Sequence, residues 1–179
     1  ISVNNEVIHG IPSSRVIREG DIVSVDVGAS IGGYTGDNAA TFAVGKISNT
    51  ARKLIDVTQE CLHRAILAAQ PGNHLGDIGH AVQSFAEANG FSVVRDYVGH
   101  GVGRELHEDP SVPNYGTAGH GMLLVPGMTI AIEPMINVLG SAVRTRRDGA
   151  IVTKSGSLSA HFEHTVAITS SGPVILTRA

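Results

Sequence analysis

A long β-hairpin is predicted by residues 22–44, which read IVSVDVGASIGGYTGDNAATFAV. Apolar residues alternate with other types along its first part, the pattern of a strand with two different faces. Gly32 and Gly33 supply the backbone freedom of a hairpin connection, and we place this connection within residues 28–36. The chain then returns in a second strand, which Asp37 opens.

Two aspartates, Asp26 and Asp37, occupy this hairpin. Asp26 lies among valines, where a carboxylate is costly to bury unless a cation or hydrogen-bond donors satisfy it. Antiparallel pairing brings the two side chains near each other, and adjacent carboxylates repel unless a cation lies between them. The pair therefore indicates a metal site or catalytic carboxylates. The alternative is that Asp37 only caps the turn.

A glycine-rich stretch, YVGHGVGRELHEDP at residues 97–110, contains His100 and His107 beside acidic neighbours. Its glycines permit backbone conformations closed to other residues and let a ligand approach closely. The stretch is typical of a loop around a reaction centre, and a flexible surface turn is the alternative.

Two further carboxylates lie in apolar strands: Glu133 near the end of residues 128–134 and Glu163 within residues 158–168. An oxygen-rich donor set with one imidazole suits hard divalent ions such as Mn²⁺, Fe²⁺ or Co²⁺. Four negative charges balance two such ions, which predicts a metal pair and metal-assisted hydrolysis. The predicted ligands are Asp26, Asp37, His100, Glu133 and Glu163.

Two amphipathic helices are predicted between the hairpin and the glycine-rich stretch. Apolar residues recur at helical spacing over residues 51–69, preceded by N-cap candidates at 48–50, and again over residues 75–86, with Asn73 opening the second helix. Cys61 occupies an apolar position of the first helix and is interpreted as a core residue. Strands with a helix pair between them indicate an α+β fold.

Composition restricts the functional class. A chain of 179 residues with 42% hydrophobic content and a net charge of −3 predicts a single domain, residues 1–179. Scattered positive charges and 4% aromatic residues argue against a nucleic-acid substrate. No apolar run reaches about 18 residues, so no membrane span is expected. A single cysteine agrees with a reducing, cytoplasmic location.

Seven segments resemble, in the same order, the motifs of the type I (bacterial-type) methionine aminopeptidases. They read SVNNEVIHG at 2–10, VDVG at 25–28, YTGD at 34–37, GHGVG at 99–103, LHE at 106–108, IEPM at 132–135 and FEHT at 162–165. The resemblance implies a pita-bread fold, in which a curved antiparallel sheet is backed by helices. It also implies a dinuclear aminopeptidase that removes methionine from the N-terminal peptide of nascent polypeptides, with the ribosome as a candidate partner.

The resemblance also implies roles for individual residues. The five predicted ligands would bind two divalent ions (Co, Mn, Fe or Zn), with Asp37 and Glu163 bridging them. His9 and His107 would contact the substrate near the scissile amide, and Glu133 would handle a proton.

The chain differs from this family at its N-terminus, because family members carry two helices before the segment that begins with the residue matching Ile1. We therefore expect an N-terminally truncated catalytic domain without the first helix pair. The strand face opposite Asp26, with Val23, Val25 and Val27, would then lack its cover. Two other functions stay open: a metal-free pita-bread module that binds peptides without hydrolysis, and a proline-specific exopeptidase of the same fold. The complete ligand set favours the hydrolase.

Overall fold

The computed structural model describes residues 1–178. The elements in chain order are β1 (Ser2–Val3), β2 (Glu6–Ile8), β3 (Ile22–Ile31), β4 (Tyr34–Ala43), α1 (Asn49–Ala68), α2 (Leu75–Ala88), β5 (Ser92–Val93), β6 (Gly99–Gly101), β7 (Glu108–Val112), β8 (Thr129–Ile132), β9 (Met135–Asn137), β10 (Val143–Thr145), β11 (Ile151–Thr153), β12 (Ser159–His161), β13 (Glu163–Thr169) and β14 (Gly172–Ile175).

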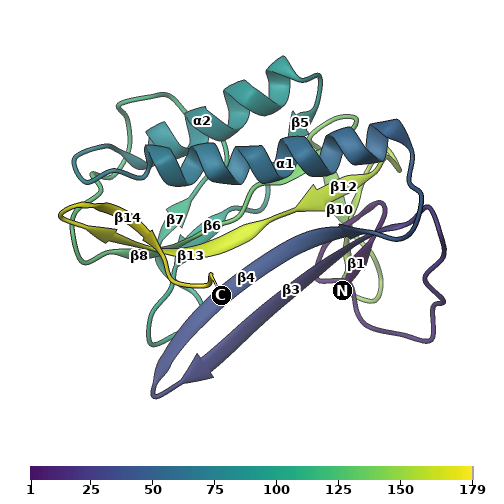
Figure 1. The fold of residues 1–179 in the computed structure, drawn as a ribbon, viewed down its shortest axis with the longest axis horizontal. Coiled ribbons are helices and arrows are strands. Elements are labelled where there is room, and N and C mark those ends of the chain that lie inside the picture. Colours follow the sequence, from purple (N-terminus) through teal and green to yellow (C-terminus); the bar gives the residue numbers. More distant parts are fainter. Residues whose placement is uncertain (179) are drawn as a thin grey trace.

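The main sheet has eight strands in the order β1-β3-β4-β13-β8-β6-β7, with β14 paired to β13. Two smaller sheets, β10-β11-β2 and β12-β9-β5, adjoin it, and the named strands pair antiparallel throughout. Both helices lie on the same side of the main sheet (Figure 1). The expected α+β architecture, an antiparallel sheet backed by helices, is confirmed.

The two helices begin where their sequences provide a cap. The Ser48 hydroxyl accepts a hydrogen bond from the backbone N–H of Ala51 at 3.1 Å, which satisfies one free donor of the first turn of α1. His74, and not Asn73 as expected, is the N-cap of α2, and its N–H donates to the Asp77 carboxylate at 2.7 Å. The extents of both helices otherwise agree with the sequence pattern.

The core lies between the helices and the main sheet. Ile130 and Ile132 of β8 and Val166 of β13 are at most 1% exposed and pack with the apolar stripe of α1. Each fully buried side chain of this size contributes roughly 1.5–3 kcal/mol. Cys61 belongs to this core, and burial raises the pKa of its thiol to about 12, which agrees with a structural role.

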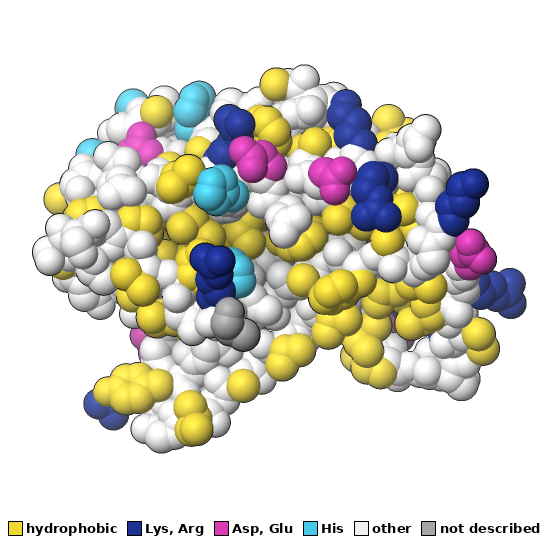
Figure 2. Space-filling model, in the orientation of Figure 1, with side chains coloured by type: hydrophobic (Ala, Val, Ile, Leu, Met, Phe, Trp, Pro, Cys, Tyr) yellow, Lys and Arg dark blue, Asp and Glu magenta, His cyan; other side chains and the backbone are white. Residues whose placement is uncertain are grey.

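The hairpin β3–β4 projects from the body as a long arm (Figure 1). Its turn contains only Gly32 and Gly33, with φ of 60° and 82°, so the predicted connection over residues 28–36 is wrong. The strands continue to Ile31 and Tyr34, both exposed, and hydrophobic side chains are visible at the tip of the arm in Figure 2. The strands in the outer half of the arm pair with each other but pack against no hydrophobic core. The sequence there therefore lacks the alternation of apolar and polar residues that would have predicted a strand.

The valine face of the arm is covered only in part. Val23 is buried, Val25 is partly buried and Val27 is 55% exposed. Exposure therefore increases along β3, and the expectation that all three valines lack a cover is wrong for the first of them.

Some strands were not expected from the sequence. β6 and the start of β7 fall within the glycine-rich stretch that was expected to be a loop, and β14 follows the last predicted strand. Within residues 1–178, no helix is both long enough and apolar enough to cross a membrane.

Candidate metal centre

Four of the five predicted ligands lie in strands of the main sheet, and the fifth, Glu133, directly follows the strand β8. In the strand register, Asp26 of β3 lies opposite Ala39 of β4, which lies opposite Glu163 of β13. His100 of β6 lies opposite Ala131 of β8, which lies opposite Thr165 of β13. Residues opposite each other across strands share a face, as do residues two apart in one strand. The face of Glu163 is therefore also the face of Thr165.

The same rule places the two remaining ligands. Asp37 lies two residues before Ala39, and Glu133 lies two residues after Ala131, directly beyond the end of β8. Ala39 and Ala131 are buried and end at Cβ, so these positions leave space between the longer charged side chains. The sheet thus directs four carboxylates and one imidazole to the face opposite the helices.

His100 is the imidazole of this group. One donor atom each from Asp37, His100 and Glu163 lie within 4.8 Å of one another. His100 Nε2 is 3.9 Å from Asp37 Oδ2 and 3.5 Å from Glu133 Oε1. Its Nδ1 is 2.9 Å from the carbonyl oxygen of Gly101, which can only accept, so Nδ1 carries the proton. In the neutral ring, Nε2 then carries the lone pair that a metal ligand needs and directs it toward the carboxylates.

The surroundings of Glu163 indicate whether these five residues fit a cation. The side chain is 2% exposed, and burial followed by the charges of Glu133, Asp37 and Asp26 raises the pKa of its carboxyl far above the ordinary range. Its Oε1 has no hydrogen-bond partner among the described residues. A buried, unpaired carboxylate among like charges is costly, and a divalent cation removes that cost. The donor set fits hard divalent ions.

Buried hydrogen bonds hold two of these residues. The Thr165 hydroxyl accepts from the backbone N–H of Asp37 at 2.8 Å and donates to the Asp37 carbonyl at 2.9 Å. The Asn114 amide donates to the Glu133 carbonyl at 3.0 Å. Such outer contacts orient metal ligands. Neither Thr165 nor Asn114 was predicted from the sequence, because nothing local to them indicates a partner so far along the chain.

Asp26 differs from the other carboxylates. It is exposed, so the expected cost of burying it among valines does not arise, and that part of the sequence argument is wrong. Its charge nevertheless reaches Glu163, whose pKa it helps to raise. The arm thus carries Asp26 to the solvent side of the group.

The two predicted substrate-contacting histidines are also exposed. The rings of His107 and His100 have centroids 4.3 Å apart at an angle of 59°. His9 lies edge-on to Tyr97, with ring centroids 6.2 Å apart. Its φ of 59° is uncommon for a residue other than glycine, and such backbone conformations gather at functional sites.

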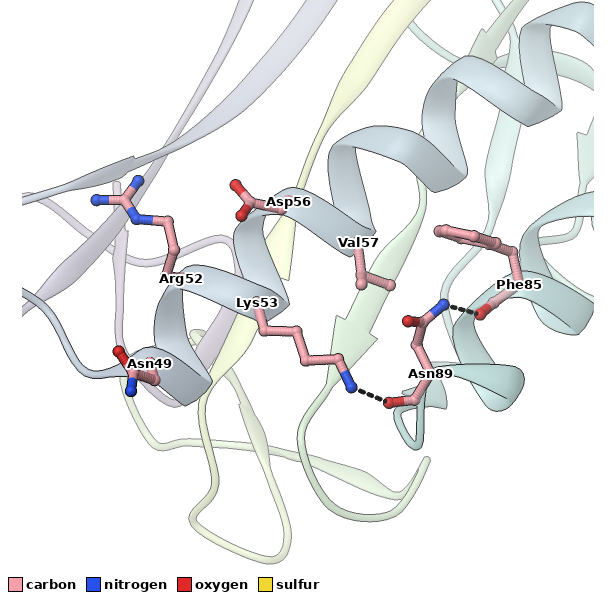
Figure 3. A pocket seen from close by; sticks show the side chains of 7 residues that line it. All are labelled: Asn49, Arg52, Lys53, Asp56, Val57, Phe85 and Asn89. Carbon is pink, nitrogen blue, oxygen red and sulfur yellow. Dashed lines mark hydrogen bonds between the residues drawn. The ribbon is translucent and has the colours of Figure 1, made fainter.

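A cavity of about 350 Å³ opens on the helical side of the molecule, between the start of α1 and the end of α2 (Figure 3). The Lys53 ammonium donates to the Asn89 carbonyl at 2.8 Å, and the Asn89 amide donates to the Phe85 carbonyl at 2.9 Å. None of the predicted site residues lines it. We therefore assign the chemistry to the carboxylate face.

Comparisons with known proteins agree with this geometry. The sequence profile of metallopeptidase family M24 matches residues 1–170. The chain is 52% identical over 179 residues to methionine aminopeptidase 1 of Bacillus subtilis, covering 99% of this chain and 72% of that protein. It is 57% identical over 178 residues to a methionine aminopeptidase of Clostridium acetobutylicum, with 98% and 71% covered.

Solved structures show the same pattern. The crystal structure of methionine aminopeptidase from Thermotoga maritima superposes with a TM-score of 0.98 at 53% identity, covering 99% of this chain and 72% of that one. A prolidase from Pyrococcus horikoshii superposes with a TM-score of 0.79 at 25% identity, covering 99% and 46%.

Proposed function

We infer the function of this chain from the premise that it belongs to metallopeptidase family M24. The chain is a metal-dependent hydrolase, and its reaction is the removal of methionine from the N-terminus of nascent polypeptides. The observation that carries this proposal is the gathering of four carboxylates and one imidazole on one face of the sheet, in a chain about half identical to methionine aminopeptidases.

The two other functions considered from the sequence are less well supported. A proline-specific exopeptidase would be expected to resemble the prolidase more than the methionine aminopeptidases. The identity and the TM-score of this chain are both lower against the prolidase than against the methionine aminopeptidase from Thermotoga maritima. A metal-free binding module would have no use for Glu163, whose buried oxygen lacks a partner among the described residues. The hydrolase explains both observations.

We assign two divalent ions to the site, which Asp26, Asp37, His100, Glu133 and Glu163 would hold, Asp37 and Glu163 being the carboxylates that the resemblance would make common to both. When bound, such ions stabilise developing negative charge and activate water for attack on a carbonyl. Among Co, Mn, Fe and Zn, the oxygen-rich donor set favours the harder ions Mn²⁺, Fe²⁺ and Co²⁺.

The remaining steps belong to the side chains. Glu133 takes a proton from the attacking water and delivers it to the leaving amine, as general acid–base catalysis requires. His107 donates a hydrogen bond to the carbonyl oxygen of the scissile amide as negative charge develops there. His9 contacts the substrate beside this amide and holds it in register. Both histidines are exposed, so a peptide can reach them from solvent.

We place the reaction in the cytoplasm, where nascent chains emerge, with the ribosome as a candidate partner. The single cysteine is buried and unpaired, which suits a reducing compartment.

Peptide hydrolysis by the purified chain tests the proposal. The chain, loaded in turn with Mn²⁺, Fe²⁺, Co²⁺ or Zn²⁺, is given Met-Ala-Ser and a dipeptide that ends in proline. We expect cleavage of Met-Ala-Ser, loss of this activity on chelation, and two equivalents of metal by elemental analysis. The control is His164→Gln, because His164 lies on the helical face of β13 opposite Ile132. Exclusive cleavage of the proline dipeptide, or metal binding without any hydrolysis, would contradict the proposal.

A further inference from the structure

A second imidazole is buried beside the carboxylate group. His161, the last residue of β12, is 1% exposed, and neither of its ring nitrogens has a hydrogen-bond partner among the described residues. Nε2 lies 3.4 Å from Glu133 Oε2, slightly longer than a well-formed hydrogen bond. Buried polar groups without partners are rare in native proteins, so this ring requires an explanation.

The backbone of His161 is held on two sides. The Thr41 hydroxyl accepts from the His161 N–H at 2.9 Å and donates to the His161 carbonyl at 2.8 Å. Because that hydroxyl has only one proton, Ser24 must be the donor in its 2.8 Å contact with Thr41. In the β12–β9 register, His161 also lies opposite Met135, which follows Glu133 by two residues. The backbone of His161 is therefore held in a fixed place relative to the strand that follows Glu133.

The two oxygens of Glu133 face different imidazoles. Oε1 is 3.5 Å from His100 Nε2, and Oε2 is 3.4 Å from His161 Nε2. His100 carries its proton on Nδ1, toward the Gly101 carbonyl, so it cannot donate to Oε1 in that tautomer. When His100 is neutral, His161 is thus the imidazole that can donate a hydrogen bond to Glu133.

We propose that His161 is a positioning residue: its Nε2–H donates to Glu133 Oε2 and so turns Oε1 toward Asp37, His100 and Glu163. This inference rests on the proposed function, because it gives Glu133 a metal to bind. His161 itself is not assigned a place against the substrate, and it acts through Glu133. Outer partners of metal ligands typically contribute ~10–100-fold to metal affinity or activity.

Three substitutions separate hydrogen bonding from packing. The side-chain amide nitrogen of glutamine reaches about as far as Nε2 of histidine, whereas that of asparagine reaches only as far as Nδ1. His161→Gln therefore keeps the donor in place, His161→Asn withdraws it, and His161→Leu removes it while filling the space. His164→Gln is the matched control, since His164 lies three residues away on the opposite face, with Nδ1 2.9 Å from the Thr177 hydroxyl.

Mn²⁺ affinity, measured by titration calorimetry without substrate, is the main readout. We expect His161→Asn and His161→Leu to bind Mn²⁺ ~10–100-fold more weakly than wild type. His161→Gln and His164→Gln should bind it like wild type. On Met-Ala-Ser at saturating Mn²⁺, the loss should appear in kcat and leave KM unchanged. Equal weakening in His161→Gln and His161→Leu, or normal affinity in His161→Asn and His161→Leu, would overturn the proposal.

A measurement on the unsubstituted protein covers the case in which a variant fails to fold. Nitrogen-15 NMR of the metal-free chain reports which ring nitrogen of His161 carries the proton. We expect Nε2–H, and a neutral ring protonated only on Nδ1 would overturn the proposal. Calorimetry also separates the two hypotheses. If wild type binds Mn²⁺ and His161→Leu weakens that binding, but no methionyl peptide is cleaved, then the proposed function fails while the role of His161 stands.

Discussion

Asp26 and Glu163 place a carboxyl group at each end of one row across the sheet, with Ala39 between them. Glu163 is 2% exposed, whereas Asp26 is exposed on the projecting arm. At the buried end a negative charge destabilises the fold until a proton or cation offsets it, and at the exposed end water solvates it. In the proposed centre, a buried carboxylate such as Glu163 lowers the stability of the metal-free fold, whereas the exposed Asp26 does not.

The largest effect on activity is expected from replacing either of the two carboxylates, Asp26 or Glu163. Asp26→Asn and Glu163→Gln each remove a negative charge and alter a metal-binding oxygen, so turnover of Met-Ala-Ser should fall to background and metal content should decrease. Only Glu163→Gln should also stabilise the metal-free chain at neutral pH, because only at Glu163 must the chain take up a proton in order to fold. Elemental analysis, kinetics and thermal unfolding measure all three. An Asp26→Asn variant with wild-type metal content and rate would exclude the exposed end from the centre.

A smaller loss of activity is expected when His107, whose exposed imidazole lies next to His100, is replaced. His107→Ala should lower kcat by ~10²–10⁴-fold, the range typical of acid–base or electrostatic assistance. Metal content should stay at the wild-type value, since His107 is not assigned as a ligand. Loss of metal in parallel with activity would instead make His107 a ligand.

The pH dependence of stability should report the buried end directly. In the metal-free chain, burial and neighbouring carboxylates raise the pKa of Glu163 from 4.5 to about 10. The folded state therefore holds a proton that the unfolded state has lost, so the contribution of Glu163 to stability is greatest below about pH 4.5 and falls as pH rises toward 10. One proton gives a slope of at most about 1.4 kcal/mol per pH unit. Urea titrations of wild type and Glu163→Gln measure it, and equal slopes would contradict the assignment.

Two threonine variants compare how much one hydroxyl group contributes to stability in the buried part of the sheet and on the exposed arm. Thr165→Val leaves the N–H and the carbonyl of Asp37 without their partner in a buried place and should cost about 1–3 kcal/mol. Thr35→Val, on the exposed arm, loses only a contact with Ser30 and should stay within about 0.5 kcal/mol of wild type. Urea unfolding of both variants gives the difference. Equal effects would mean that the Asp37–Thr165 bonds do not stabilise the buried region.

Alternation along single strands was sufficient to single out the acidic residues proposed as donors. Asp26 and Glu163 could be recognised because each interrupts an apolar strand, although Asp26 proved to be exposed. Thr165 and His161 could not be recognised in this way. Their partners, Asp37 and Glu133, lie 128 and 28 residues away along the chain, and only strand pairing brings them together.

The sequence by itself determined the two helices, the presence of the hairpin and the residue types of the centre, because these depend on the spacing of residues within one segment. The tertiary structure decided how far the arm extends, which carboxylates are buried and which groups surround Glu133. These properties depend on the order and register of strands from distant parts of the chain. That order is set by the packing of the whole sheet against α1 and α2, which no local pattern records.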